Sequence, residues 1–265
     1  MSAAVPNVSD RMKSTGTEFA LELRNVSKKF GALVALADIN MTVHPGERHA
    51  VLGSNGAGKT TLFNCITGDF PPSTGAIRFF GEDVSAFPAQ ERIRRGLRRT
   101  YQISLLFHGL SVIDNVYLAC RGVSRGRFSL IRPRYDDALM ATARDLVHMV
   151  HLDDVQDSMV STLSYGQQRQ LEIAMALSGA PRFILFDEPA AGLSPTERTE
   201  LIEILTGLPA HVGYIIIEHD MDVALRVSDM VTMMHNGRIF KEGKPAEIEE
   251  DPEVQALYLG GGEDE

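Results

Sequence analysis

Hydrophobic and polar residues alternate along the first part of the chain. Phe19, Leu21 and Leu23 are separated by single residues in EFALELRNVSKKF, and the alternation continues through ALADINMTVHPGE to a Pro-Gly pair at 45–46. A period of two places every second side chain on one face of a strand, and a Pro-Gly pair is a turn signal. The pattern predicts an antiparallel β-section with one buried face.

From residue 48 onward, short apolar runs alternate with stretches of helical periodicity. RHAVLG, FILFDEP and YIIIEHD have the length of buried strands, whereas TTLFNCITGDF, RQLEIAMALSG and TERTELIEILTGL have helical spacing. Strands that alternate with helices form a largely parallel sheet covered on both faces, and ligands bind at its carboxyl edge. We therefore expect an α/β fold with a site at that edge.

The pattern changes between about residues 105 and 165. A basic loop, RGVSRGRFSLIRPR, precedes YDDALMATARDLVHMVHL, in which apolar residues recur every three or four positions. This spacing predicts a helix with one buried stripe, formed by Leu139, Ala143, Leu146, Met149 and Val150. We interpret the segment as a mainly helical subdomain and the stripe as part of its core.

The two ends of the chain differ in composition from the rest. Residues 1–18 are rich in Ser, Asn, Pro and Thr and lack an apolar run, which predicts a flexible segment without a signal peptide. Residues 260–265 predict a solvated acidic tail.

The net charge of −9 argues against a broad nucleic-acid-binding surface. No apolar run reaches the roughly 18 to 20 residues that span a bilayer, so no transmembrane segment is expected.

Arginine and cysteine are informative through their placement. AQERIRRGLRRT holds five arginines within eight residues, and we interpret this run as a solvated face, with a docking surface as the alternative. Cys65 and Cys120 are the only cysteines. Their separation fits neither a disulfide framework nor a zinc site and favours a reducing compartment. Cys65 is expected to be a buried hydrophobe rather than a reactive thiol.

The stretch GSNGAGKTT at 53–61 satisfies the P-loop pattern. A predicted strand precedes it and a predicted helix follows, which is the structural context that the pattern requires. Backbone N–H groups in such a loop, together with the positive end of the helix dipole, form a binding site for a polyphosphate. Lys59 would then reach the β and γ phosphates, and Thr60 would ligate Mg²⁺. A tight turn alone would not explain the lysine.

FILFDEP supplies two acids at the end of a buried strand. Asp187 fits the carboxylate that holds the metal beside a P-loop. Glu188, one residue further, could orient or deprotonate a water molecule that attacks the γ-phosphate. The alternative is that the two acids cap the following helix.

A third motif, LSYGQQRQ at 163–170, lies between the P-loop and FDEP. Alone it is also compatible with a helix cap. With its two neighbours it resembles the signature of the ATP-binding cassette (ABC) ATPases. The resemblance implies an α/β fold: a P-loop NTPase (RecA-like) core with an antiparallel β-subdomain and a helical ABC-specific subdomain. It also implies that Ser164 and Gly166 face the γ-phosphate of an ATP held by another subunit.

Further positions match the family one at a time. Gln102 in RTYQ resembles the glutamine that senses Mg²⁺ and water, and His219 in IIIEHD resembles the histidine that contacts the γ-phosphate. Phe30 in KKFGALVAL resembles the aromatic residue stacked on adenine. Taken singly, each would more often be structural. One position departs from the family: AGLSPTE has Ser194 where an aspartate is common, which puts the usual carboxylate contact between subunits in doubt.

The motifs and the resemblance together define the expected site. The catalytic residues are expected to be Glu188, His219, Gln102 and Lys59, and the Mg²⁺ ligands Thr60, Gln102 and Asp187. The ATP-binding residues are expected to be Phe30, Gly53, Ser54, Asn55, Gly56, Ala57, Gly58, Lys59, Thr60, Thr61, Ser164, Gly166 and Gln167.

Within the family, residues 19–259 look most like the ATP-binding subunits of branched-chain (hydrophobic) amino acid importers. The likeness is carried by the basic loop before the helical insert and by the stretches FNCITGDFPPSTGAI, RTYQISLLFHGLSVIDNV, AAGLSP and PAEIEEDPEVQALYLG. Urea importers and lipopolysaccharide exporters have similar subunits and stay open as alternatives. A soluble ABC ATPase outside transport is a further alternative, although the single cassette without a long heptad insert argues against it. Glu188 argues against a module that binds nucleotide without turnover.

The resemblance also implies the surroundings of the chain. ATP and Mg²⁺ are the expected cofactors. The expected partners are a second ATPase subunit, integral membrane permease subunits and, indirectly, a periplasmic or extracellular solute-binding protein. The chain is expected to be peripheral, on the cytoplasmic face of the inner (plasma) membrane. Leu105, Leu106 and Phe107 could form a groove for a permease helix, or they could pack within the domain.

Overall fold

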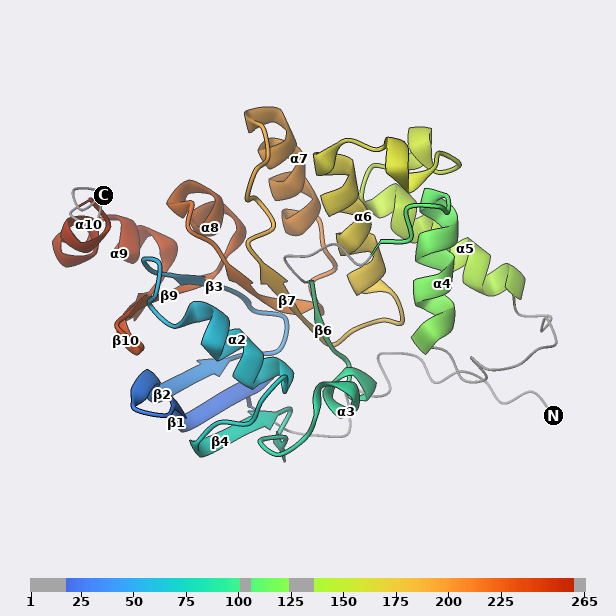
Figure 1. Cartoon of the computed structure of the whole chain (residues 1–265). Coiled ribbons are helices and arrows are strands. Elements are labelled where there is room, and N and C mark those ends of the chain that lie inside the picture. Colours follow the sequence, from blue (N-terminus) through green and yellow to red (C-terminus); the bar gives the residue numbers. More distant parts are fainter. Residues whose placement is uncertain (1–17, 101–105, 124–135, 260–265) are drawn as a thin grey trace.

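The computed structural model describes residues 18–100, 106–123 and 136–259 (Figure 1). Its strands are β1 (Leu21–Phe30), β2 (Leu33–Val43), β3 (Arg48–Leu52), β4 (Thr74–Phe79), β5 (Glu82–Asp83), β6 (Leu97–Arg99), β7 (Phe183–Asp187), β8 (Gly213–Ile217), β9 (Met230–His235) and β10 (Arg238–Gly243). Its α-helices are α2 (Lys59–Thr67), α3 (Ala89–Arg94), α4 (Val112–Val123), α5 (Asp136–Met149), α6 (Tyr165–Leu177), α7 (Pro195–Thr206), α8 (Met221–Val227), α9 (Pro245–Glu249) and α10 (Pro252–Leu259). Two short 3₁₀ helices cover Asp153–Val155 and Val160–Thr162.

The strands form two sheets of different character. The first has the order β2-β1-β4-β5 and is antiparallel, as the alternating N-terminal pattern predicts. The second has the order β10-β9-β3-β8-β7-β6 and is parallel except for β10 at its edge. The fold is therefore α/β, and the predicted combination of a parallel core and an antiparallel section is confirmed.

Each face of the parallel sheet packs against its own hydrophobic core. On one face, α2 is enclosed between the two sheets, and Leu62, Phe63 and Ile66 are fully buried there. On the other face, the sheet packs against α6, α7 and α8, and this core extends to α4 and α5. Because both faces are covered, the central strands are largely apolar, as in FILF at 183–186 of β7.

The helices α4, α5 and α6 lie side by side, away from the antiparallel sheet (Figure 1). The predicted stripe of α5 is part of the core: Ala143, Leu146 and Val150 are buried, and Leu139 and Met149 pack against the same cluster. The helical periodicity of the sequence therefore identified the packed face correctly.

The interpretation of the arginine run as a solvated face is wrong for two of its members. Arg92 is 1% exposed and donates hydrogen bonds to the carbonyl oxygens of Cys65 and Ile66 near the end of α2. Arg99 is also buried, with acidic partners. Carbonyls at a helix end and buried carboxylates both attract a guanidinium, and a charge count along the chain does not reveal these partners.

Both cysteines are buried, as expected for Cys65. Burial raises the pKa of each thiol to about 11, which opposes formation of the reactive thiolate.

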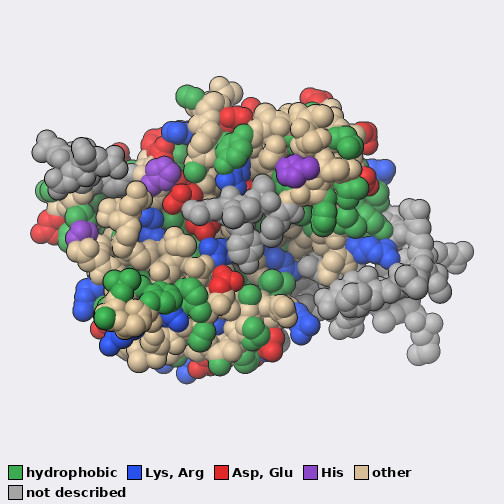
Figure 2. Space-filling model, viewed as in Figure 1, with side chains coloured by type: hydrophobic (Ala, Val, Ile, Leu, Met, Phe, Trp, Pro, Cys, Tyr) green, Lys and Arg blue, Asp and Glu red, His purple; other side chains and the backbone are tan. Residues whose placement is uncertain are grey.

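In the parts of the chain that the structure describes, we find no helix with the length and hydrophobicity to span a bilayer. On the face shown in Figure 2, Lys and Arg side chains are interspersed with Asp and Glu rather than gathered in one broad patch.

Candidate functional site

The P-loop connects the end of β3 to the start of α2. Gly53 has φ 152°, and a Cβ there would lie 2.3 Å from the carbonyl oxygen of Met234 on β9. Gly58, with φ 99°, also passes close to β2, where a Cβ would lie 2.8 Å from the carbonyl oxygen of Ala35. Only glycine fits such positions. Close contacts with β9 on one side and β2 on the other therefore constrain the backbone conformation of the loop.

The N-terminus of α2 is left without a side-chain cap. Its N-cap residue, Gly58, makes no side-chain hydrogen bond, and the first turn holds no acidic residue. The first N–H groups of a helix have no intrahelical acceptor, and they carry the positive end of the dipole. Thr60 in this turn is exposed and Thr61 is half-buried. Together with the glycines of the loop, this arrangement provides donors for an anion.

Lys59 extends back across the loop that precedes it. Its Nζ donates to the carbonyl oxygens of Gly53 (2.6 Å) and Ser54 (3.1 Å), and the residue is 6% exposed. Burial lowers the pKa of Lys59, while the nearby carboxylates of Glu188 and Asp187 oppose this effect. The P-loop lysine and the two acids of FDEP are therefore brought together at one edge of the sheet.

Asp187 ends β7 with its carboxylate almost fully buried. Its Oδ2 accepts a hydrogen bond from Arg99 Nη2 at 2.6 Å, whereas its Oδ1 is buried without a hydrogen-bond partner. A buried carboxylate oxygen needs a donor or a cation. Among the described residues, no group of three or more His, Cys, Asp or Glu could hold a metal alone. Mg²⁺ fits this site, because it commonly binds one carboxylate together with phosphate oxygens and water.

Glu188 follows Asp187 in a left-handed conformation, with φ 48°. Such conformations are strained for non-glycine residues and are often found at active sites. The Glu188 side chain is 26% exposed, and its Oε2 lies 3.9 Å from Nδ1 of His219 at the end of β8. The acid and the histidine predicted from two distant motifs are thus neighbours across adjacent parallel strands.

Glu218, between these strand ends, was not assigned a role from the sequence. Its side chain is buried, and Oε1 accepts a hydrogen bond of 2.8 Å from the backbone N–H of Ala190, while Oε2 has no hydrogen-bond partner. Burial raises its pKa to about 7, and the charges of Glu188 and Asp220 add to the effect. The signal available in the sequence was a charged residue directly after the apolar run YIII.

The signature motif forms the N-terminus of α6. Ser164 is its N-cap and makes a capping box with Gln167, so the helix-cap interpretation is also correct. The carboxylate of Glu197 faces the same helix end: Oε1 accepts from Ser164 Oγ (3.3 Å) and from the Gly166 N–H (3.1 Å). A Cβ at Gly166 would lie 2.4 Å from this oxygen. The donors expected to meet a phosphate are therefore held by an internal carboxylate.

Glu197 also caps the next helix, α7. Its Oε2 accepts hydrogen bonds from the Ser194 N–H (2.9 Å) and Ser194 Oγ (2.8 Å). These hydrogen bonds, led by the Ser194 N–H, lower the pKa of Glu197. Ser194, which departs from the usual aspartate of the family, thus forms a capping box. Glu197 was missed because its sequence position predicts a capping acid but not a contact with α6.

Phe30 lies at the end of β1 with 46% of its surface exposed. Its ring contacts Phe70 edge-on with centroids 5.4 Å apart, and Lys28 Nζ lies 5.1 Å from its centroid. Figure 2 shows hydrophobic side chains gathered over this end of the antiparallel sheet. The ring is accessible for stacking.

The structure describes two of the remaining predictions only in part: the role of Gln102 and the groove of Leu105, Leu106 and Phe107. Gln102 and Leu105 lie outside the described residues. Leu106 is 8% exposed and belongs to the core, whereas Phe107 is 55% exposed. Leu106 therefore packs within the domain, and only Phe107 of this pair presents an apolar surface to solvent.

The sequence of residues 36–191 matches the family described as ABC transporter. With the P-loop, FDEP and signature motifs in the arrangement above, the chain belongs to this family. It is a nucleotide-binding, ATP-hydrolysing subunit of an ABC transporter.

Two sequence relatives and one solved structure show which members of the family the chain is similar to. The chain is 34% identical over 248 residues to the high-affinity branched-chain amino acid transport ATP-binding protein BraF of Pseudomonas aeruginosa, covering 91% of this chain and 97% of BraF. It is 35% identical, with the same coverage, to LivG of Escherichia coli K12, which carries the same description. The solved structure of MJ1267 in its ADP conformation, an ATP-binding cassette of an ABC transporter, superposes with a TM-score of 0.80 at 28% identity. That alignment covers 91% of this chain and 99% of MJ1267.

Proposed function

We propose that this ABC ATPase energises the import of branched-chain amino acids. The proposal for the solute rests on the similarity to BraF and LivG over almost the whole of each chain. The proposal for the ATPase site rests on one observation: three strand ends bring Lys59, Asp187, Glu188 and His219 to one edge of the parallel sheet. The ATPase of a urea importer or of a lipopolysaccharide exporter remains the alternative.

In the proposed site, residues 53–61 bind the phosphates of ATP through backbone N–H groups, and Lys59 exchanges its carbonyl acceptors for phosphate oxygens. Phe30 stacks on the adenine. Thr60, Gln102 and Asp187 would hold Mg²⁺, which would neutralise charge on the phosphates. Glu188 orients the attacking water and accepts its proton, and His219 donates a hydrogen bond to the γ-phosphate.

The proposed site is completed by a second ATPase subunit. Ser164, Gly166 and Gln167 of one copy then face the γ-phosphate of an ATP bound to the P-loop of the other. Closure of the pair would move permease subunits in the membrane. The chain would then be peripheral, at the cytoplasmic face of the inner membrane. A solute-binding protein would act on the outer side without contacting this chain.

Glu188→Gln tests the ATPase site. This change keeps the shape of the side chain but removes the base, so we expect hydrolysis to fall by at least about 100-fold while ATP still binds. A stable ATP-dependent dimer should then appear by size-exclusion chromatography with light scattering. Hydrolysis at the wild-type rate would show that Glu188 does not have the proposed role.

The solute is tested separately by uptake. Cells that lack this protein should lose high-affinity uptake of labelled leucine, isoleucine and valine, and wild-type protein but not the Glu188→Gln variant should restore it. Unchanged leucine uptake combined with loss of urea uptake would favour the alternative solute and leave the ATPase site unaffected.

A further inference from the structure

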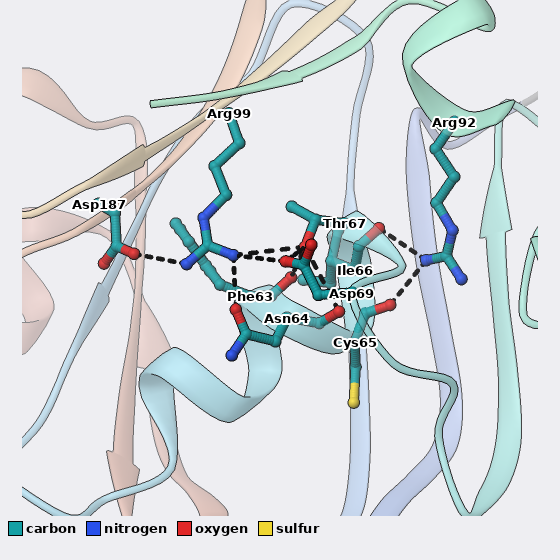
Figure 3. A network of polar contacts seen from close by, with 9 residues as sticks. All are labelled: Phe63, Asn64, Cys65, Ile66, Thr67, Asp69, Arg92, Arg99 and Asp187. Carbon is teal, nitrogen blue, oxygen red and sulfur yellow. Dashed lines mark hydrogen bonds and ion pairs between the residues drawn. The ribbon is translucent and has the colours of Figure 1, made fainter. Parts of the chain in front are cut away.

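Arg99 is a buried arginine that joins three parts of the site (Figure 3). It is the last residue of β6, and its side chain is 7% exposed. The Nη2 atom donates to Asp187 Oδ2 at 2.6 Å. The Nη1 atom donates to Asn64 Oδ1 at 2.5 Å and Asp69 Oδ2 at 2.9 Å. One guanidinium thus connects the acid at the end of β7 to the P-loop helix and to Asp69, two residues beyond that helix.

Because of this contact, the two carboxylate oxygens of Asp187 differ in their hydrogen bonding. Oδ2 is engaged by Arg99, whereas Oδ1 is buried and has no hydrogen-bond partner. A carboxylate held through one oxygen cannot rotate freely, so the direction of the other oxygen is determined. Arg99 therefore selects which oxygen of Asp187 is available to a cation and where that oxygen lies.

The second half of the guanidinium determines the position of α2 relative to β7. Asn64 lies on α2, whose first turn holds Lys59 and Thr60. A short helix moves as a rigid unit, so a contact at Asn64 also constrains the distance from Thr60 to Asp187. The guanidinium carbon of Arg99 also lies 5.8 Å from the centroid of the Phe63 ring, within the range of a cation–π contact.

We propose that Arg99 is a positioning residue for the Mg²⁺ site: it orients Asp187 through Oδ2 and holds α2, which carries Thr60, in place relative to Asp187. This inference rests on the proposed nucleotide site. Partners that orient metal ligands in this way typically change metal affinity by about 10- to 100-fold when they are removed.

The planar fork of arginine is essential to the proposal. Its two terminal nitrogens reach acceptors in opposite directions, as Figure 3 shows for Asp187 on one side and Asn64 and Asp69 on the other. A lysine keeps the positive charge but has a single ammonium group on a flexible chain. Arg99→Lys therefore avoids burying an unpaired acid and removes the simultaneous hold on both elements.

The test measures how ATP binding depends on Mg²⁺, using fluorescent ATP in the presence of EDTA and then in a Mg²⁺ titration. For Arg99→Lys we expect the half-saturating Mg²⁺ concentration to rise about tenfold or more. The metal-free Kd for ATP should change by less than about twofold, because the P-loop donors are unchanged. Spectroscopic titration with Mn²⁺ should show the same loss of metal affinity.

Arg92→Lys is the matched control. Arg92 is also buried and also binds α2, through the carbonyl oxygens of Cys65 and Ile66, but it does not contact Asp187 in the structure (Figure 3). We expect Arg92→Lys to lower the melting temperature without changing the Mg²⁺ dependence. A purely structural role for Arg99 predicts that the two variants behave alike, and this result would overturn the proposal.

A second variant covers the case in which Arg99→Lys does not fold. Asp69 is one-third exposed, and Asp69→Asn weakens the hold on Nη1 without disturbing Asp187. It should raise the half-saturating Mg²⁺ concentration about two- to threefold, and an unchanged value would overturn the inference.

If wild-type protein bound no ATP at all, the proposed nucleotide site itself would be wrong. If wild-type binding depended on Mg²⁺ but neither variant altered it, only the role of Arg99 would be rejected.

Discussion

The N-termini of α2 and α6 present similar backbone groups but differ in what occupies them. At α2 no side chain caps the helix, and among the described residues Lys59 donates its hydrogen bonds to the neutral carbonyl oxygens of Gly53 and Ser54. At α6 the N-cap Ser164 forms a capping box, and the carboxylate of Glu197 accepts from both Ser164 and Gly166.

This difference has an energetic consequence for binding of a phosphate group. At α2 a phosphate replaces neutral acceptors, so Lys59 and the helix dipole gain an opposite charge. At α6 a phosphate must displace Glu197, so one anion is exchanged for another and the net gain is smaller. We therefore expect the P-loop to bind ATP first and the signature motif to engage it second.

The largest effect is expected from the α2 side. Lys59→Ala removes the cation that faces the phosphates, and we expect MgATP hydrolysis to fall by about 100- to 1000-fold. Steady-state phosphate release measures this loss, with Lys241→Ala on β10 as a control that should retain activity. Undiminished hydrolysis by Lys59→Ala would contradict the assignment of the P-loop.

Glu218 is a buried acid beside the nucleotide-binding edge, and it accepts a hydrogen bond from the N–H of Ala190 between β7 and α7. Its folded pKa of about 7 lies above the value of 4.5 for an exposed glutamate. Between these pH values the folded protein keeps a proton that the unfolded chain releases, so the free energy of unfolding falls as pH rises. Glu218→Gln should remove a loss of about 1 to 3 kcal/mol between pH 5 and pH 8.

Urea denaturation at the two pH values measures this effect. Glu203→Gln, on the exposed face of α7, serves as the control because its side chain is solvated. An identical pH dependence in wild type and Glu218→Gln would show that the buried carboxyl does not titrate in this range.

Phe30 lies on the α2 side of the comparison, and its substitution tests whether the ring stacks on the adenine of a bound ATP. Phe30→Ala removes the stacking surface and should weaken ATP binding about fivefold, at the low end for base stacking because the ring is half exposed. Equilibrium binding of ATP measures the change. Phe240→Ala, an exposed aromatic on β10, is the control, and equal effects of the two changes would argue against stacking.

The smallest effect tests the α6 side directly. Glu197→Gln removes the negative charge but retains the capping box of α7, because glutamine is also favoured at this position. In the Glu188→Gln background we expect dimers to form at about two- to fivefold lower ATP concentration, since the signature donors no longer face an anion. Light scattering across an ATP titration measures this shift. A higher ATP requirement would mean that Glu197 supports rather than competes with closure.

The arrangement of the nucleotide-binding edge was largely predictable, because its parts depend on local sequence. A glycine-rich loop between an apolar run and a helical period has few alternative structures, and FDEP and IIIEHD place their polar residues directly after buried strands. Parallel strands present their carboxyl ends at one edge, so Asp187, Glu188 and His219 were expected to converge. The antiparallel sheet and the buried stripe of α5 were predictable for the same reason.

The environments of Arg92, Arg99 and Glu197 were not predictable in this way. Each residue lies in a charged stretch that is compatible with solvent exposure, and each contacts partners that are distant in sequence. Arg99 and Asp187 are separated by 88 positions, and Glu197 and Gly166 by 31. Periodicity identifies which face of an element is apolar, but it does not specify the element against which a polar residue packs.

By itself, the sequence determined the class of fold, the P-loop, the order of the motifs and the acids that end the strands, because these follow from local periodicity and backbone chemistry. The packing of the chain was needed to see that Arg99 binds Oδ2 of Asp187 and leaves Oδ1 without a hydrogen bond, and that Glu197 accepts from the Gly166 N–H of the signature motif. The physical reason is that the state of a charge depends on which groups surround it in space, and those groups are brought together only when the sheets and helices pack.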